Sequence, residues 1–446
     1  MSPRGTRARR ANGRKRAIWL AAGVVLLGGT GVTAVAAPAE GGGVGPGDGA
    51  RPANAHVLTL DGKDPRKRAL PRTGTRTFSL VGVSWEDAGD TFEGIAQIRT
   101  REAATGEWSA WRDLDFGIRP PESTEGGTSD VRGASEPLWV GPSNGIEARI
   151  VADGEETAVP DALRLDMIDP GETAKGEGRS RNKLDGDAEK SAEESAGKSY
   201  EADTVPATDP TGDPTGEPTG DPTVEPTSEP TTPAPTTPAP TTPTAPAVVS
   251  RAAWGADESL VQDPPSYLNK LDAVFVHHTA GTNNYTCADS PAIIRAILTY
   301  HVRTNGWNDI GYNFFVDKCG TVFEGRAGGV DRPVLGAHTY GFNSYSAGIS
   351  LLGDYENGGT PTAAAKQAIA DLAAWKLGLH GVDPEAKVAL TAAGDTGVWK
   401  KGQVVTLNTI SGHRDGYATL CPGATLYSAL PGIRTAAGAS PYATGN

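Results

Sequence analysis

LDAVFVHHTAG, residues Leu271 to Gly281, is the stretch that decides the predicted fold of this chain. Its apolar run, residues 273–276, ends at His277 and His278. Short runs of β-branched and aromatic residues closed by glycine are typical of a buried strand. Successive strand residues point to opposite faces, so only one of the two histidines can enter a given site. A histidine pair here can also simply be the polar end of a core strand, and residues further along the chain decide between the two interpretations.

The first 36 residues predict a secretory signal peptide. Residues 1–16 carry seven Lys or Arg and no acid, and an apolar run follows over residues 17–35. Ala34-Val35-Ala36 then supplies a small-x-small cleavage site. We therefore expect a secreted protein, associated with a cell wall and with no stable membrane anchor after cleavage. The alternative is a retained anchor, because the apolar run is near the lower length limit for spanning a bilayer.

The charge of the chain argues against a nucleic-acid partner. The formal net charge is −13, and removal of the seven N-terminal positive charges would change it to −20. Phosphate binding needs clustered Lys and Arg, so a mature protein this acidic is expected to bind no nucleic acid.

The length of 446 residues suggests two globular parts, of which residues 52–168 predict an all-β, sandwich-like accessory domain. Its β-rich runs are short and are separated by Gly, Pro and Asp: 78–85, 94–102, 137–141, 145–152 and 162–168. Four tryptophans in this region are either core residues or a sugar-stacking surface: Trp85, Trp108, Trp111 and Trp139.

Residues 169–248 predict a disordered linker. An acidic, Gly- and Ser-containing stretch with almost no large apolar residue comes first and cannot form a core. A unit of the type DPTG then repeats from Asp209 to Thr232, and Pro at every fourth position forbids helix and sheet. With such a linker, the two globular parts are expected to move nearly independently.

Residues 249–446 predict an α/β domain, a mixed β-sheet flanked by helices. Ser290-Pro291 is typical of a helix N-cap followed by the first helical position, and Thr360-Pro361 predicts the start of a second long helix. Residues 306–317 and 322–326 are interpreted as paired strands, and residues 346–354 as another buried strand.

Three cysteines, Cys287, Cys319 and Cys421, leave one thiol outside any disulfide in an exported protein. The sequence itself leaves three pairings open. Cys421 follows His413 by eight residues, and together with His277 these are the ligand types of a catalytic zinc site with one open position. A chain with seven histidines and three cysteines offers many such triples, so this arithmetic alone does not establish zinc.

Four motifs carry a resemblance to a known family. VFVHHTAG, GWNDIGYNFFVDKCGTVFEGR, GAHTYGFNSYSAGISLLGDY and SGHRDGYATLCPG resemble, in order, those of the peptidoglycan recognition proteins and type 2 N-acetylmuramoyl-L-alanine amidases. The resemblance covers essentially all of residues 250–432. In the accessory domain, ATGEWSAWRDL resembles the β domain that precedes the catalytic domain in secreted actinobacterial amidases.

The resemblance implies roles for particular residues. It places the zinc ligands at His277, His413 and Cys421, and the catalytic hydroxyls at Tyr312 and Thr419. With Cys421 on zinc, the disulfide joins Cys287 and Cys319, and strand alternation gives His278 a structural role. Substrate binding and a structural role are equally open for five residues of the family's groove: His301, Trp307, Arg326, His338 and Asn343.

The implied activity is zinc-dependent hydrolysis of the amide between N-acetylmuramic acid and L-alanine in peptidoglycan. The alternative is a peptidoglycan-binding module without turnover, used for sensing or wall attachment. A zinc peptidase lacks support, because no HExxH-type motif is present. The sequence indicates no proton carrier for the leaving amine, since Glu324 and Asp415 can equally pair with nearby arginines.

Overall fold

The computed structural model describes residues 51–60, 69–88, 94–115, 131–152, 155–156, 163–172, 245–261 and 263–443. The predicted signal peptide and most of the predicted linker, including its Pro- and Thr-rich repeats, lie outside these residues. Within the described ranges, no helix has the length and apolar character needed to cross a membrane. The β domain is named here for residues 51–172, and the α/β domain for residues 245–443.

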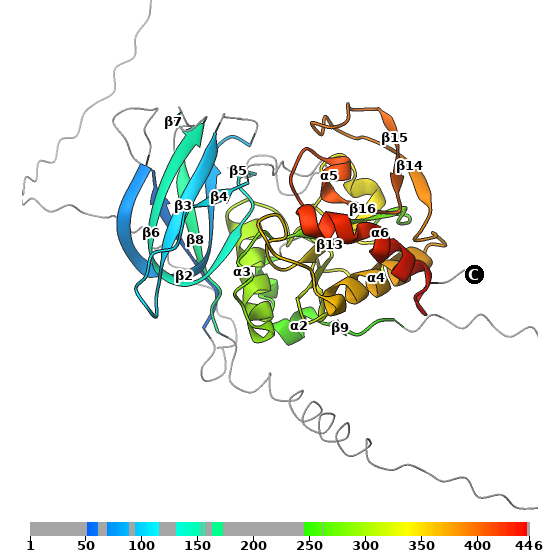
Figure 1. Ribbon diagram of the computed structural model, residues 1–446, viewed down its shortest axis with the longest axis horizontal. Helices are drawn as coiled ribbons and strands as arrows, with labels where there is room; N and C mark the ends of the chain where they lie inside the picture. The colour runs from blue at the N-terminus through cyan, green and yellow to red at the C-terminus, as the bar shows by residue number, and fades with distance from the viewer. Residues whose placement is uncertain are drawn as a thin grey trace, which may run out of the picture. The chain divides into compact units, whose positions relative to one another are not determined.

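The β domain is one antiparallel sheet with the strand order β1-β8-β2-β6-β3-β4, to which β5 and β7 add short pairings. Figure 1 shows its strongly curved strands in blue and cyan. The strands are β1 (Asn54–Thr59), β2 (Ala69–Trp85), β3 (Ile95–Glu102), β4 (Arg112–Leu114), β5 (Gly133–Ala134), β6 (Leu138–Ala152), β7 (Glu155–Glu156) and β8 (Arg164–Asp169).

Register shifts along β2 and β6 let this single sheet enclose a core. Residues 69–81 of β2 pair, with interruptions, with residues 138–149 of β6, and residues 80–84 of β2 also pair with β8. Such irregularities bend a strand and increase its twist. The sandwich-like interior is therefore lined by one continuous sheet. The predicted runs 137–141 and 145–152 belong to one strand, β6, in which Gly141 adopts a φ of 79°.

The four tryptophans of the β domain divide between its core and its surface. Trp85 and Trp139 are buried, as the core interpretation expects. Trp108 and Trp111 are only half-buried, and the guanidinium groups of Arg72, Arg99 and Arg149 lie over their rings at 4.3 to 5.9 Å. Arginines thus lie over both half-buried rings, and the sugar-stacking interpretation of Trp108 and Trp111 stays a prediction.

The α/β domain contains a mixed six-stranded sheet with the order β16-β10-β13-β11-β12-β9. Strand β10, second in this order, runs parallel to both of its neighbours, β13 and β16, while β11 and β12 are antiparallel to each other. A separate antiparallel pair is formed by β14 and β15. The strands are β9 (Val248–Val249), β10 (Ala273–His278), β11 (Phe314–Val316), β12 (Val322–Glu324), β13 (Ser346–Leu351), β14 (Lys387–Thr391), β15 (Val404–Asn408) and β16 (Ile410–Gly412).

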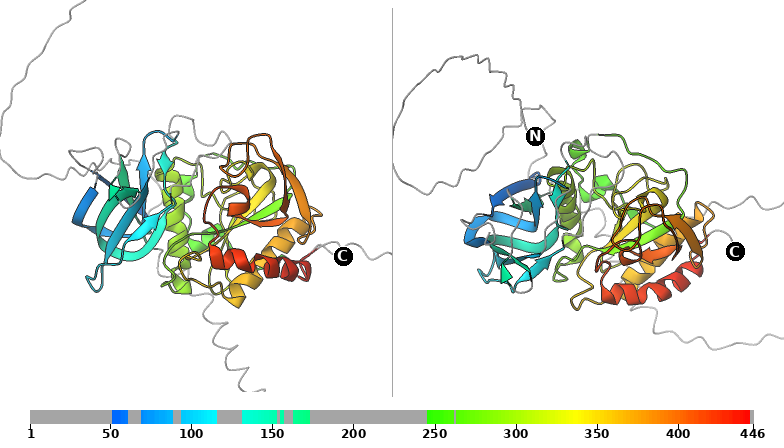
Figure 2. Two further views of the ribbon diagram at one scale, coloured as in Figure 1. Left: turned by 45° about the horizontal axis from the view of Figure 1, so that its top comes forward. Right: turned by 90° about the horizontal axis from the view of Figure 1, so that it is seen from above.

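Helices cover this sheet on both faces, which confirms the predicted α/β class (Figures 1 and 2). Val274 and Val276 of β10 share a core cluster with α4 and α6, whereas Phe275 packs against β14 and β15. The helix α3 packs in a second cluster with Phe315 and Phe323. The helices are α2 (Arg251–Trp254), α3 (Ser290–Arg303), α4 (Ala363–Gly378), α5 (His413–Gly416) and α6 (Ala424–Gly438), with 3-10 turns at Glu258–Leu260, Cys287–Asp289 and Asn343–Tyr345.

Two predicted helix starts differ slightly from the structure. The cap of α4 is Thr362, whose side chain accepts the Ala365 N–H, so this helix begins after the predicted Thr360-Pro361. Ser290 is the first residue of α3 rather than its cap, because a 3-10 turn leads directly into the helix. Its hydroxyl donates to Asp317 at 2.9 Å.

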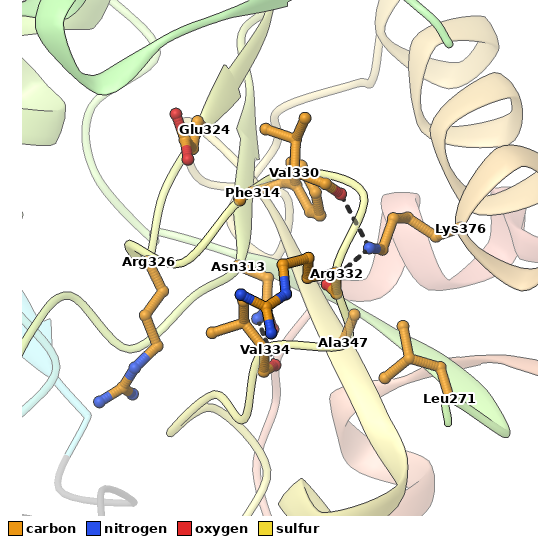
Figure 3. A pocket seen from close by; sticks show the side chains of 11 residues that line it. Leu271, Asn313, Phe314, Glu324, Arg326, Val330, Arg332, Val334, Ala347 and Lys376 are labelled. Atoms are coloured by element: carbon orange, nitrogen blue, oxygen red, sulfur yellow. Dashed lines mark hydrogen bonds between the residues drawn. The ribbon is translucent and has the colours of Figure 1, made fainter. Parts of the chain in front are cut away.

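Two tethers hold loops of the α/β domain in place. The disulfide between Cys287 and Cys319 joins the start of α3 to the β11–β12 turn, which confirms the predicted pairing. Lys376 of α4 is buried, and its ammonium donates to the carbonyls of Val330 and Arg332 at 2.8 and 3.0 Å (Figure 3). Burial lowers the pKa of Lys376 to about 8.

The β domain and the α/β domain share one buried apolar cluster. Leu80, Trp139 and Ile168 pack with residues of α3, including Ile293 and Tyr300. The Tyr300 hydroxyl donates to the Ser135 carbonyl at 3.1 Å. The expectation that the two parts move nearly independently is therefore wrong, because separating them would expose this apolar surface to water.

We expect Gly82→Ala to destabilise this contact, because a Cβ at Gly82 would overlap the buried ring of Tyr300. Overpacking of this kind costs about 1–3 kcal/mol, which urea denaturation of the whole chain measures. Gly74→Ala in the same strand is the matched control, since the nearest atom to its Cβ is Arg101 Nη2 at 3.8 Å. Equal unfolding midpoints for the two variants would contradict the close approach of Tyr300 to β2.

Candidate metal centre

The strand β10 places His277 at the carboxyl edge of the parallel strands. His277 pairs in register with Ser350 of β13 and is 0% exposed. Its side chain lies on the face of Phe275, while His278 lies on the opposite face of the strand. There His278 Nδ1 accepts the backbone N–H of Tyr355 at 3.1 Å. The two histidines therefore have the different environments that strand alternation predicts.

His413 reaches the same edge from the neighbouring strand β16. It follows Gly412, the last residue of β16, and opens the short helix α5. The carboxylate of Asp415 accepts hydrogen bonds from the Gly412 N–H, at 2.8 Å, and from the Tyr427 hydroxyl. Asp415 therefore stabilises the turn between β16 and α5. The His413 ring stacks on Tyr417 at 5.5 Å between centroids.

Cys421 completes the group from the loop that follows α5. Its N–H donates to the Thr419 hydroxyl at 3.1 Å, and its carbonyl accepts the Arg414 N–H at 3.0 Å. The thiol is buried and free, and Sγ lies 3.7 Å from His277 Nδ1. The Sγ atom also accepts the backbone N–H of His278 at 3.4 Å.

Ligand atoms of His277, His413 and Cys421 all lie within 4.8 Å of one another, so β10 and the segment that follows β16, far apart in sequence, converge on one point. Two imidazoles and one thiolate suit a tetrahedral metal that keeps a fourth position open. The described residues contain one other such group, around Cys287 and Cys319, but the disulfide consumes its thiols. The donor set at His277 thus fits a zinc ion.

The protonation states of the histidines also fit metal binding. Burial and neighbouring histidines lower the pKa of His277 well below its usual value and that of His413 to about 3. Both rings are therefore neutral at pH 7, which metal coordination requires. Burial raises the pKa of the Cys421 thiol, an effect that a bound cation would oppose.

His338 holds the ring of His277 in a defined orientation. Its Nδ1 lies 3.2 Å from His277 Nε2, and its Nε2 lies 3.5 Å from the Ser346 carbonyl. If His338 donates to that carbonyl, its Nδ1 accepts the His277 Nε2–H and leaves His277 Nδ1 facing Cys421. Asn343 supports this arrangement, because its Oδ1 accepts the N–H groups of His338 and Thr339. Both predicted groove residues thus have structural partners.

Tyr312 and Thr419, the predicted catalytic hydroxyls, lie beside the metal ligands. The Tyr312 ring is buried and 5.0 Å from the His277 ring, and burial raises its pKa well above the usual value. Its Oη lies 3.4 Å from Oε2 of Glu136, and the Thr419 hydroxyl donates to Asp115 at 3.2 Å. Both carboxylates belong to the β domain, and no sequence motif pointed to them.

The other predicted groove residues surround Tyr312. His301 Nδ1 accepts the Gly311 N–H at 3.1 Å, and its ring lies 4.7 Å from that of Trp307. The Arg326 N–H donates to the Tyr312 carbonyl, and its side chain extends away from Lys376 (Figure 3). His301, Trp307 and Arg326 are each less than 7% exposed, so they back the site rather than form an open surface. Glu324 accepts the Arg251 N–H instead of facing the ligands.

A cleft of about 760 Å³ lies between the two domains, beside the loop that carries Cys421. From the α/β domain it is lined by His278, Ala280, Asp354, Glu356, Asn357, Ala418, Thr419 and Leu420. From the β domain it is lined by Gly94, Ile95, Asp113, Leu114, Asp115, Glu136, Pro137 and Leu138. Its size suits a ligand of several sugar or amino-acid units.

Known proteins resemble both domains. A family model described as N-acetylmuramoyl-L-alanine amidase matches residues 267–424, and one described as Rv3811 N-terminal galactose-binding domain-like matches residues 46–175. Peptidoglycan-recognition protein SC2 of Drosophila melanogaster is 33% identical over 41% of this chain and 84% of that protein. Peptidoglycan recognition protein 1 of Bos taurus is 32% identical over 41% of this chain and 82% of that protein. The solved structure of Drosophila PGRP-LB is 27% identical over 41% of this chain and 91% of that chain, with a TM-score of 0.32.

We expect His338→Ala to weaken metal binding by about 10- to 100-fold, because the acceptor that orients His277 is lost. Competition with a chromophoric zinc chelator measures the affinity, and circular dichroism checks the fold. His380→Ala is the control, since His380 lies beyond the end of α4 and outside the ligand group. An unchanged affinity in His338→Ala would contradict the orienting role.

Proposed function

Because the chain belongs to the N-acetylmuramoyl-L-alanine amidase and peptidoglycan recognition protein family, we propose that it is a zinc-dependent amidase of peptidoglycan. The proposed bond is the amide between N-acetylmuramic acid and L-alanine. The observation that carries the proposal is the convergence of His277, His413 and Cys421 on one buried point. A protein that only recognises its ligand has no need of this donor set.

Zinc bound by His277, His413 and Cys421 would supply a Lewis acid and lower the pKa of water at its open position. The buried imidazoles are neutral without the loss of a proton, so they are ready to act as ligands. His338 keeps Nδ1 of His277 directed toward Cys421. The chain thus offers three ligands for zinc, beside a cleft that is lined by Thr419 and Leu420 of the Cys421 loop.

Hydroxyl groups beside the ligands suit the oxyanion that amide hydrolysis develops. Donors placed in advance in a buried site stabilise such charge more strongly than water does. Tyr312 is fixed by its packing against His277 and His301. Thr419 is fixed because its oxygen accepts the Cys421 N–H. We assign the two hydroxyls to the oxyanion side of the reaction.

We infer the substrate, peptidoglycan, from the names of the relatives and from the shape of the site. The cleft is large enough for a muramoyl group together with the first residues of a stem peptide. Polymeric peptidoglycan lies outside the cell membrane, and the proposed signal peptide of residues 1–36 would export the enzyme to it. We therefore propose a secreted, wall-associated enzyme.

Peptidoglycan binding without turnover is the second candidate, because the curated relatives are named recognition proteins. Such a protein would use the same cleft and would release no product. The complete ligand set favours turnover over this alternative.

We expect the zinc-loaded full-length chain to release L-alanine-terminated stem peptides from purified cell walls, as measured by mass spectrometry. His277→Ala should lose zinc and all turnover, because a ligand is missing. His278→Ala is the matched control and should retain zinc, since its ring lies on the other face of β10 and contacts Tyr355. Binding to cell walls with no peptide release by zinc-loaded chain would favour the recognition role. Equal zinc loss in both variants would contradict the assignment of the ligand.

A further inference from the structure

A segment of the β domain, residues 132–139, is fixed against the α/β domain by its own backbone. The N–H of Arg132 donates to the Asn305 carbonyl, and the Trp139 carbonyl accepts the Thr282 N–H at 2.9 Å. Between them, the Ser135 carbonyl accepts the Tyr300 hydroxyl at 3.1 Å. Three hydrogen bonds across the interface thus bracket Glu136, which lies in the middle of the segment.

Glu136 faces the metal centre rather than the solvent side of the β domain. It lines the cleft, and its Oε2 lies 3.4 Å from Oη of Tyr312. Tyr312 in turn packs against the ring of His277. The backbone N–H of Glu136 donates to the Asp115 carbonyl at 2.8 Å, so two carboxylates of the β domain line the cleft together. The second, Asp115, accepts the Thr419 hydroxyl.

The interface that carries Glu136 is built to stay closed. Trp139 and Leu80 are buried in one cluster with α3, and the Cβ of a residue at Gly281 would lie 2.9 Å from the Cβ of Trp139. Arg112 adds a bond to the Ala280 carbonyl at 3.0 Å. Apolar burial and close packing of this kind favour a lasting contact between the two domains over one that opens during turnover.

We propose that the β domain is part of the active site, and that Glu136 is a positioning residue that holds the Tyr312 hydroxyl toward the metal centre. This inference rests on the proposed amidase function. It gives the accessory domain a role in turnover itself, in addition to any binding of the cell wall.

A neutral Glu136 explains how Tyr312 can be held and still act. Burial, and then the nearby Asp115, raise the pKa of Glu136 to about 8. In the structure the Tyr312 hydroxyl donates to Oε2 of Glu136; a neutral Glu136 carboxyl can instead donate to the Tyr312 oxygen and leave the phenolic hydrogen for the oxyanion. Gln is isosteric with this protonated form and also offers a donor, whereas Ala offers none.

The test compares variants of the zinc-loaded full-length chain on a soluble N-acetylmuramoyl-L-alanine peptide. Glu136→Ala should lower kcat by about 10- to 100-fold with little change in KM, zinc content or Tm. Glu136→Gln should restore most of the lost rate. Glu107→Gln is the matched control, because Glu107 is an exposed carboxylate of the same domain outside the cleft.

A double-mutant cycle decides whether Glu136 acts through Tyr312. In a Tyr312→Phe background, Glu136→Ala should cause no further loss, because the group that it positions is already gone. Additive losses would overturn the inference, as would an unchanged rate in Glu136→Ala. If Glu136→Gln is as slow as Glu136→Ala, the positioning role is overturned, because Glu136 would then act by transferring a proton.

The same measurements separate this inference from the proposed function. If the zinc-loaded wild-type chain cleaves the peptide and Glu136→Ala cleaves it equally fast, only the inference fails. If the zinc-loaded wild-type chain cleaves nothing, the proposed function fails and the inference falls with it.

Discussion

Parallel pairing of β10 with β13 and β16 is the constraint on which the rest of this structure depends. Parallel strands end at the same edge of a sheet, so the residues that follow them meet there. His277 is the penultimate residue of one strand and His413 follows the next, which brings together two proposed ligands separated by more than a hundred residues. The apolar residues of β10 bury both faces of the strand and fix its register, and the short loop to Cys421 then needs only to fold back onto this edge.

The β domain contributes a second constraint, which acts on the cleft. Its curved sheet is held against α3 by an apolar cluster, and this contact brings Asp115 and Glu136 to the hydroxyls of Thr419 and Tyr312. The α/β domain thus supplies the proposed metal ligands, and the β domain supplies carboxylates that contact the hydroxyls beside them. Because the cleft is lined by both domains, a change that weakens the interface between them is also expected to disturb the site.

Much of the α/β domain could be predicted from sequence, because its signals are local. The sequence shows an apolar run that ends in His277 and a cysteine placed eight residues after His413. The family resemblance assigned these residues to one metal site. The role of the β domain could not be predicted, since Glu136 and Tyr312 are 176 residues apart and no motif marks either Glu136 or Asp115. The predicted linker also suggested that the two domains move independently. The composition of a linker, however, carries no information on whether two domains bury apolar surface against each other.

X-ray absorption at the zinc edge of the full-length chain tests the central claim most directly. The account predicts one sulfur neighbour at about 2.3 Å and two imidazole nitrogens at about 2.0–2.1 Å, with the remaining position taken by a light atom. The sulfur signal should disappear in Cys421→Ala. A zinc environment without sulfur in the wild-type chain, or a sulfur signal that survives the loss of Cys421, would contradict the assignment of His277, His413 and Cys421 as the metal centre.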